Sequence, residues 1–88
     1  MSTIDALRAS LATLDPLQLD IRDDSHLHAG HAGAREGGHF AVRIIAARFA
    51  GLSTMRRHRL VYDALGDLRD RGVHALSIIA KTPDEIQP

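Results

Sequence analysis

The spacing of hydrophobic positions changes several times along the chain, and each change marks a predicted element. Near the start, isoleucine and leucine recur at helical spacing until Pro16 interrupts the pattern. Leu17, Leu19 and Ile21 then alternate with polar residues, as in a half-buried strand. Residues 39–47 are rich in Phe, Val and Ile and predict a second, central strand. The first half therefore predicts a helix followed by two antiparallel strands.

The second half of the chain returns to helical spacing and then to a strand. An apolar stripe runs to Arg71, with Gly72 suited to end the helix, and residues 55–59 form either its first turns or a short separate helix. Residues 73–80 are apolar and β-branched enough for a third strand. The expected order is αββααβ, or αββαβ if the two middle helices merge. This order predicts an α+β fold, with helices packed on one face of a mixed three-stranded sheet.

The length of 88 residues allows one hydrophobic core. We therefore expect a single domain over residues 1–88, with residues 1–2 and 83–88 as loosely ordered ends. Residues 1–5 lack the charged and apolar regions of a secretory signal, and no apolar run approaches the ~20 residues of a membrane span. We expect a cytoplasmic location and no membrane contact.

The most unusual composition lies between the first two predicted strands. Four of the six histidines fall between positions 26 and 39, in a glycine- and alanine-rich segment without consistent period. Such a segment predicts a long loop, and loops of this length in compact domains are usually functional or disordered. The spacings of His26, His28 and His31 can capture zinc, nickel or copper, but they are common and nonspecific, which favours adventitious binding.

Cysteine and charge narrow the possible functions. The chain has no cysteine, so it can build no disulfide, thiolate nucleophile or thiolate metal ligand by itself. Any sulfur ligand must come from a partner. With 11 basic and 11 acidic residues the formal net charge is zero, so no strong overall attraction to nucleic acid or anionic membrane is expected.

A specific pattern of identities appears in the second half of the chain. Phe49 and Gly51 precede an Arg-His-Arg triplet at residues 57–59, Val-Tyr follows one residue later, and His-Ala-Leu occupies residues 74–76. With this pattern the chain resembles the BolA family from Leu7 to about Glu85. The resemblance implies an αββααβ fold similar to the class II KH domain, in agreement with the order of elements above.

The resemblance also implies a function. BolA-like proteins bind monothiol glutaredoxins, and such heterodimers can share a two-iron two-sulfur cluster in iron-sulfur trafficking or iron regulation. Glutaredoxin and glutathione supply the thiolates. By position, His74 is the family's cluster histidine and His28 is the second ligand, with His31 as its rival in the same loop. We expect no enzyme activity, no cofactor in the protein alone and a monomer when free.

The chemistry of such a ligand set is sound. Two neutral imidazoles can replace two thiolates on one iron, as in Rieske centres, and they raise the reduction potential. Because bound imidazole is unprotonated, the cluster should weaken below about pH 6. Without the resemblance, the pattern makes His74 a hydrogen-bonded, half-buried residue of a strand and His28 a solvated loop residue.

A basic cluster supports a second hypothesis, a DNA-binding transcriptional regulator. Arg56, Arg57, His58 and Arg59 lie at or near a predicted helix start, and the last three are candidate contacts for a partner or for nucleic acid. A solvated helix face is the simpler interpretation. Zero net charge and the scarcity of aromatic residues argue against nucleic-acid binding, and residues 51–54 lack the second glycine of a G-x-x-G loop.

Catalysis is not expected. Histidines beside Asp23, Asp24 and Ser25 superficially suggest hydrolysis. A hydrolytic site needs a base, an orienting acid and an oxyanion hole held in a rigid pocket, and a glycine-rich loop on a small domain is a poor place for one.

Overall fold

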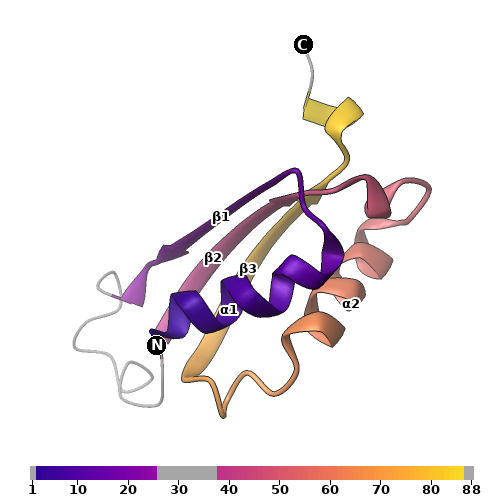
Figure 1. The fold of residues 1–88 in the computed structure, drawn as a ribbon. Helices are drawn as coiled ribbons and strands as arrows, with labels where there is room; N and C mark the ends of the chain where they lie inside the picture. Colours follow the sequence, from indigo (N-terminus) through magenta and orange to yellow (C-terminus); the bar gives the residue numbers. More distant parts are fainter. Residues whose placement is uncertain (1, 26–37, 87–88) are drawn as a thin grey trace.

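Three strands form one mixed sheet in the order β1-β2-β3 (Figure 1). The structure is a computed structural model and describes residues 2–25 and 38–86. Strand β1 covers Gln18–Asp23, β2 covers Gly38–Ile45 and β3 covers Val73–Lys81. The β1 and β2 strands pair antiparallel, and β2 and β3 pair parallel. The predicted mixed three-stranded sheet with a central second strand is confirmed.

Both α-helices lie on the same face of this sheet (Figure 1). Helix α1 covers Thr3–Leu11 and continues as the 3₁₀ helix η1, Ala12–Leu14. Helix α2 covers Thr54–Leu65. Two further 3₁₀ helices, η4 (Ala47–Phe49) and η5 (Pro83–Ile86), flank the carboxyl ends of β2 and β3. No helix in the described ranges has the length and apolarity needed to cross a bilayer.

Local side-chain bonds explain where the two helices begin. The Ser2 hydroxyl accepts a hydrogen bond from the Asp5 N–H at 3.1 Å, and Asp5 completes the capping box. The Ser53 hydroxyl accepts from the Arg56 N–H at 3.2 Å at the start of α2. Ser2 and Ser53 are therefore the N-caps of α1 and α2.

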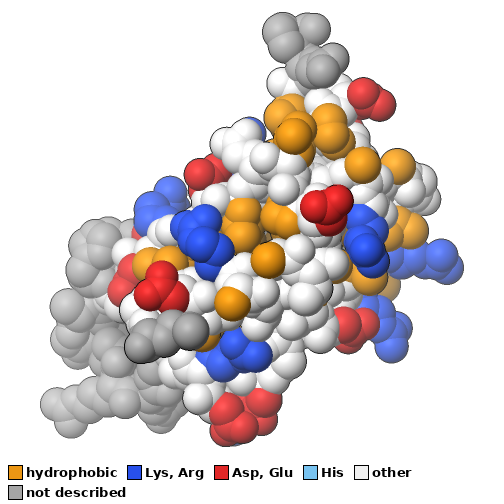
Figure 2. All heavy atoms as spheres, viewed as in Figure 1, with side chains coloured by type: hydrophobic (Ala, Val, Ile, Leu, Met, Phe, Trp, Pro, Cys, Tyr) orange, Lys and Arg blue, Asp and Glu red, His pale blue; other side chains and the backbone are white. Residues whose placement is uncertain are grey.

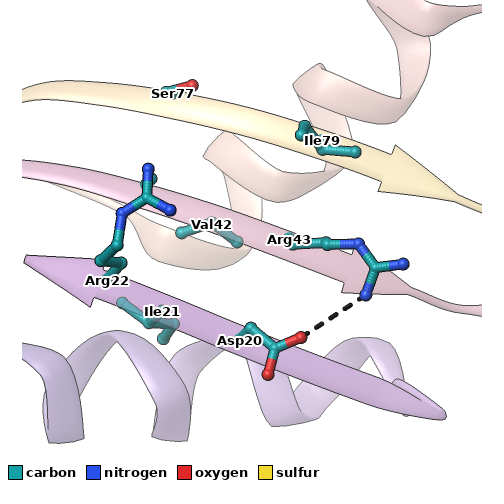
Figure 3. A pocket seen from close by; sticks show the side chains of 8 residues that line it. Asp20, Ile21, Arg22, Val42, Arg43, Ser77 and Ile79 are labelled. Carbon is teal, nitrogen blue, oxygen red and sulfur yellow. Dashed lines mark ion pairs between the residues drawn. The ribbon is translucent and has the colours of Figure 1, made fainter.

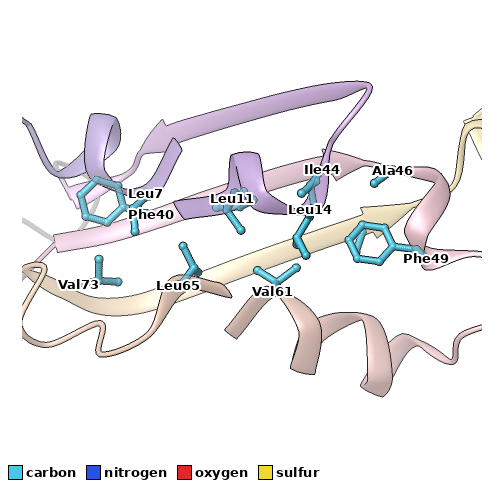
Figure 4. Packing of buried hydrophobic residues seen from close by; sticks show 12 residues of the cluster. Leu7, Leu11, Leu14, Phe40, Ile44, Ala46, Phe49, Val61, Leu65 and Val73 are labelled. Carbon is cyan, nitrogen blue, oxygen red and sulfur yellow. The ribbon is translucent and has the colours of Figure 1, made fainter. Parts of the chain in front are cut away.

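The core lies between the helices and the inner face of the sheet (Figure 4). Phe40, Val42 and Ile44 alternate along β2 and face this core, as their period of two predicts. The helices contribute Leu7 and Leu11 on one side and a Val61–Leu65 pair on the other. Burying each such side chain stabilises the fold by about 1.5–3 kcal/mol.

The middle helix is shorter than predicted. It ends at Leu65 instead of Arg71, because Gly66 adopts φ +73° and donates its N–H to the Tyr62 carbonyl at 3.0 Å. Residues 68–72 form turns, and Leu68 packs against the core from there, which explains why it fits the helical stripe. Residues 55–59 lie within α2, so the two middle helices are merged and the order is αββαβ.

Candidate functional site

The strand directions bring three segments together at one end of the sheet. Strand β1 ends there, β2 begins there, and β3, being parallel to β2, also begins there (Figure 1). The Asp24 N–H donates to the His39 carbonyl at 2.7 Å, and the His39 N–H donates to the Ser25 hydroxyl at 3.0 Å. The Gly38 N–H donates to the Gly72 carbonyl at 2.8 Å. The residues that flank the histidine-rich segment are therefore tied to each other and to the start of β3.

A β-bulge places His74 at this end. Gly38 is paired with Val73, but the next residue, His39, is paired with Ala75, so His74 is the extra residue of β3. In a regular strand, Val73 and Leu76 would point to opposite faces of the sheet, because they are three residues apart. Both pack in the core, as expected when one extra residue, His74, lies between them. Bulges commonly redirect a side chain near a functional site. His74 is exposed, and not half-buried as its pattern alone predicts.

The neighbour of His74 is a second histidine, His39. Their ring centroids are 5.3 Å apart and the ring planes make an angle of 44°. His39 is half-buried and its Nε2 atom is buried. The sequence places His39 at the start of a strand and among the clustered histidines, but its nearness to His74 depends on the parallel β2–β3 pairing between residues 35 positions apart.

The predicted loop ligands cannot be placed in the same way. His28 and His31, with their neighbour His26, lie outside the described residues. Their assignment as metal ligands stays a prediction.

In the basic cluster, Arg57 is tied into the domain. Its side chain is only 12% exposed; Nε donates to the Leu52 carbonyl at 2.9 Å and Nη1 to the Ala80 carbonyl at 3.1 Å. Nη1 also forms an ion pair with Glu85. The hydrogen bond from Arg57, followed by that from the Thr82 N–H, lowers the pKa of Glu85 to about 2. Arg57 therefore joins the start of α2 to the end of β3 and to η5.

The other members of the cluster face different surroundings. Arg56 and Arg59 are exposed, three residues apart on α2, and border a shallow hollow of about 410 Å³ with Leu52 and Leu60. His58 is half-buried and lies toward the end of β3. On the helix-bearing face, basic and acidic side chains are interspersed (Figure 2). The predicted partner or nucleic-acid contact of Arg57, His58 and Arg59 stays a prediction, and Arg56 and Arg59 are the cations best placed to make it.

The face of the sheet opposite the helices carries a second hollow, of about 310 Å³ (Figure 3). Its centre is lined by small side chains, Ala41 and Ser77, and by Ile79, which is 50% exposed. At its edge an Asp20 oxygen lies 3.6 Å from an Arg43 nitrogen. This exposed ion pair stabilises the sheet by no more than about 1 kcal/mol.

Comparison with known proteins agrees with this architecture. The family model for BolA-like proteins matches residues 11–85. The chain is 48% identical over 79 residues to SufE-like protein 1 of Arabidopsis thaliana, covering 83% of this chain and 21% of that protein. It is 46% identical over 79 residues to BolA-like protein 1 of Mus musculus, covering 89% of this chain and 56% of the mouse protein. The chain thus spans from about a fifth to just over half of these curated relatives.

Solved structures show the same fold. The structure of BolA1 from Arabidopsis thaliana superposes with a TM-score of 0.82 at 39% identity and covers 100% of this chain and 99% of that one. The BolA domain of SufE1 from the same plant gives a TM-score of 0.77 at 49% identity, with 91% of each chain covered. Fold and site define a small α+β domain with a histidine at the loop end of its sheet. The chain belongs to the BolA-like family.

Proposed function

We propose that this domain partners a monothiol glutaredoxin and shares a two-iron two-sulfur cluster with it through His74 and a loop histidine. The observation that carries the proposal is the exposed His74, held in a bulge beside both anchored ends of the histidine-rich segment. The chain has no cysteine, so glutaredoxin and glutathione supply the thiolates. In this proposal the domain is a non-catalytic cytoplasmic monomer that holds no cluster alone and acts in iron-sulfur trafficking or iron regulation.

The length of the connection favours His28 as the second ligand. His28 follows Ser25 by three residues, so its Cα lies within about 11 Å of the Ser25 Cα at ~3.6 Å per residue. His31 follows by six residues, and its limit is about 22 Å. Ser25 is hydrogen-bonded to His39, the neighbour of His74, so the shorter span from Ser25 supports His28 over His31 in this proposal.

The residues fit the chemistry of such a cluster. Two neutral imidazoles on one iron raise its reduction potential relative to thiolates. His74 supplies one imidazole from a fixed strand, and the loop supplies the other. Since protonated imidazole cannot bind iron, the shared cluster should be lost as the pH falls below about 6.

The test is anaerobic reconstitution with a monothiol glutaredoxin, glutathione, iron and sulfide. Visible absorption and circular dichroism of the size-separated heterodimer should give a cluster spectrum distinct from that of the glutaredoxin homodimer. His74→Ala and His28→Ala should abolish it, and His26→Ala, a matched loop substitution, should leave it unchanged. Absence of a complex, or a cluster spectrum unaffected by His74→Ala, would refute the assignment.

A second candidate function is DNA binding through Arg56 and Arg59. It is favoured by their exposure on one side of α2 at a spacing of three residues. Binding to duplex DNA should then weaken with salt, and each phosphate contact removed by Arg56→Gln or Arg59→Gln should reduce the slope of log K against log salt by about 1. Binding whose salt slope is unchanged in both variants would exclude this surface.

A further inference from the structure

His39 is a potential metal ligand that the proposed function does not use. It lies on β2 with its ring centroid 5.3 Å from that of His74, the exposed residue of the β3 bulge. We propose that His39 and His74 together bind one divalent transition-metal ion, such as Zn²⁺, in the domain without glutaredoxin. The ion would lie between two neighbouring strands, and the loop histidines would not be needed.

The distance between the rings matches two ligands of one tetrahedral ion. Zinc binds imidazole nitrogen at about 2.0–2.1 Å, and the ring centre lies about 1.1 Å beyond that nitrogen, so each centre would be about 3.2 Å from the metal. At a tetrahedral angle the two centres would then be about 5.2 Å apart. The observed distance is 5.3 Å. The tilt of 44° is compatible, because a ring can turn about its metal–nitrogen bond without changing this distance.

The backbone holds both residues in place before any metal binds. The carbonyl and the N–H of His39 are both hydrogen-bonded, to the Asp24 N–H and the Ser25 hydroxyl, and the next residue, Phe40, is buried in the core. The Gly38–Gly72 hydrogen bond adjoins the bulge that carries His74. Metal binding therefore needs no rearrangement of the strands and orders only two side chains, which lowers its entropic cost.

Two protein ligands leave two positions of a tetrahedral ion open. On the His39 side of the pair there is a hollow of about 200 Å³, with Asp24, Ala75 and Ser77 on its wall. A zinc ion with open positions can also accept a ligand from another molecule. The site is thus suited to a weakly held, exchangeable ion more than to a closed structural zinc.

A consequence for cluster sharing follows, and it rests on the proposed function. His74 cannot bind the cluster iron and a divalent ion through the same nitrogen. Zn²⁺ at the His39–His74 pair would therefore compete with cluster formation. Excess Zn²⁺ should lower the yield of the cluster-bridged heterodimer, and His39→Gln should weaken this inhibition by at least about tenfold in Zn²⁺ concentration.

The direct test is a titration with Co²⁺, whose visible d–d absorption reports tetrahedral coordination. It uses the full chain with His26, His28 and His31 replaced by alanine, so that the loop contributes no ligand. The expected result is one Co²⁺ per chain with tetrahedral bands that Zn²⁺ abolishes by displacement. His39→Gln and His74→Gln in this background should each remove the bands, and His58→Gln, a histidine on α2, should not.

Two results would overturn the metal site: no tetrahedral spectrum in the loop-substituted chain, or a spectrum that survives His39→Gln. Far-UV circular dichroism checks the fold of each variant. If His39→Gln unfolds, the test is made by NMR on the chain that carries only the loop substitutions. The imidazole signals of both His39 and His74 must then shift with one equivalent of Zn²⁺ if the two residues bind the ion. Loss of the cluster in His74→Ala without Co²⁺ binding would refute only the metal site. Co²⁺ binding without any glutaredoxin complex would refute only the proposed function.

Discussion

Gly38, the first residue of β2, has no room for a side chain. A Cβ there would lie 2.5 Å from the Cε2 atom of Phe40 and 2.8 Å from the Ser25 hydroxyl oxygen. The Phe40 ring is 6% exposed, and the Ser25 hydroxyl accepts the hydrogen bond of the His39 N–H. Moving the Phe40 ring would disturb its packing in the core, and moving the Ser25 hydroxyl would break its hydrogen bond with the His39 N–H. Overpacking of this kind destabilises a protein by about 1–3 kcal/mol.

Gly38→Ala should therefore destabilise the domain. Alanine in a strand normally gains about 0.5–1 kcal/mol over glycine, so the net loss is about 1–2 kcal/mol. For a domain of this size that corresponds to a fall of about 4–16 °C in Tm. Urea and thermal unfolding followed by far-UV circular dichroism measure both quantities.

A double-mutant cycle separates the clash from other effects. Phe40→Leu removes the aromatic atoms nearest the new Cβ, so Gly38→Ala should cost at least about 0.5 kcal/mol less in the Phe40→Leu background. Gly51→Ala is the control. Gly51 has a positive φ, but a Cβ added to it would have no atom within 4 Å, so its effect should add to that of Phe40→Leu. A Gly38→Ala protein as stable as the original, or strict additivity with Phe40→Leu, would refute the reasoning.

Three further predictions concern the ties that hold α2. Arg57→Leu leaves two backbone carbonyls without their donor and should cost about 2–3 kcal/mol in urea unfolding, whereas the exposed Arg59→Leu should stay within about 0.5 kcal/mol. Because the pKa of Glu85 is lowered to about 2, its stabilisation is complete above pH 4.5 and is lost between pH 4.5 and 2. The Tm difference between the original and Glu85→Gln should shrink over that range, and a constant difference would contradict the ion pair. Gly66→Ala should cost about 1–3 kcal/mol by thermal unfolding, since φ +73° with ψ −144° is accessible mainly to glycine, and an unchanged Tm would contradict this.

Local patterns predicted much of the fold correctly. Phe40, Val42 and Ile44 alternate along the chain and face the core from β2, and a serine suited to capping directly precedes each of the two helices. These features depend on residues within a few positions of each other, so the spacing along the chain already contains them.

The errors arose where distant residues decide the outcome. Leu68 continues the apolar stripe, yet it reaches the core from a turn, and only the backbone of Gly66 shows that the helix has ended. The sequence grouped Arg57 with its basic neighbours. Its acceptors include the carbonyl of Ala80, 23 positions away, which no local pattern could indicate.

The candidate site shows the same division between local pattern and topology. His74 was identified as a site residue through the family resemblance, but its exposure depends on the bulge, and its contact with His39 depends on the register of β2 against β3. Register is set by the packing of whole strands and turns. The residue types could therefore be named from the sequence, whereas the pair of rings could not.

The topology itself explains why His74 lies beside the connection between β1 and β2. An antiparallel β1–β2 pair puts its connection at the start of β2, and a β3 strand parallel to β2 must start at that same end. A side chain at the beginning of β3 is then next to the β1–β2 connection whatever the sequence of that connection. Val73 and Leu76, on either side of His74 in β3, pack in the core, and Ser25 and Gly38 hold the two ends of the connection through a hydrogen bond and a close approach to Phe40. If the proposed cluster site is correct, substitutions in the connection should therefore alter the second ligand while His74 and the paired strands stay in place.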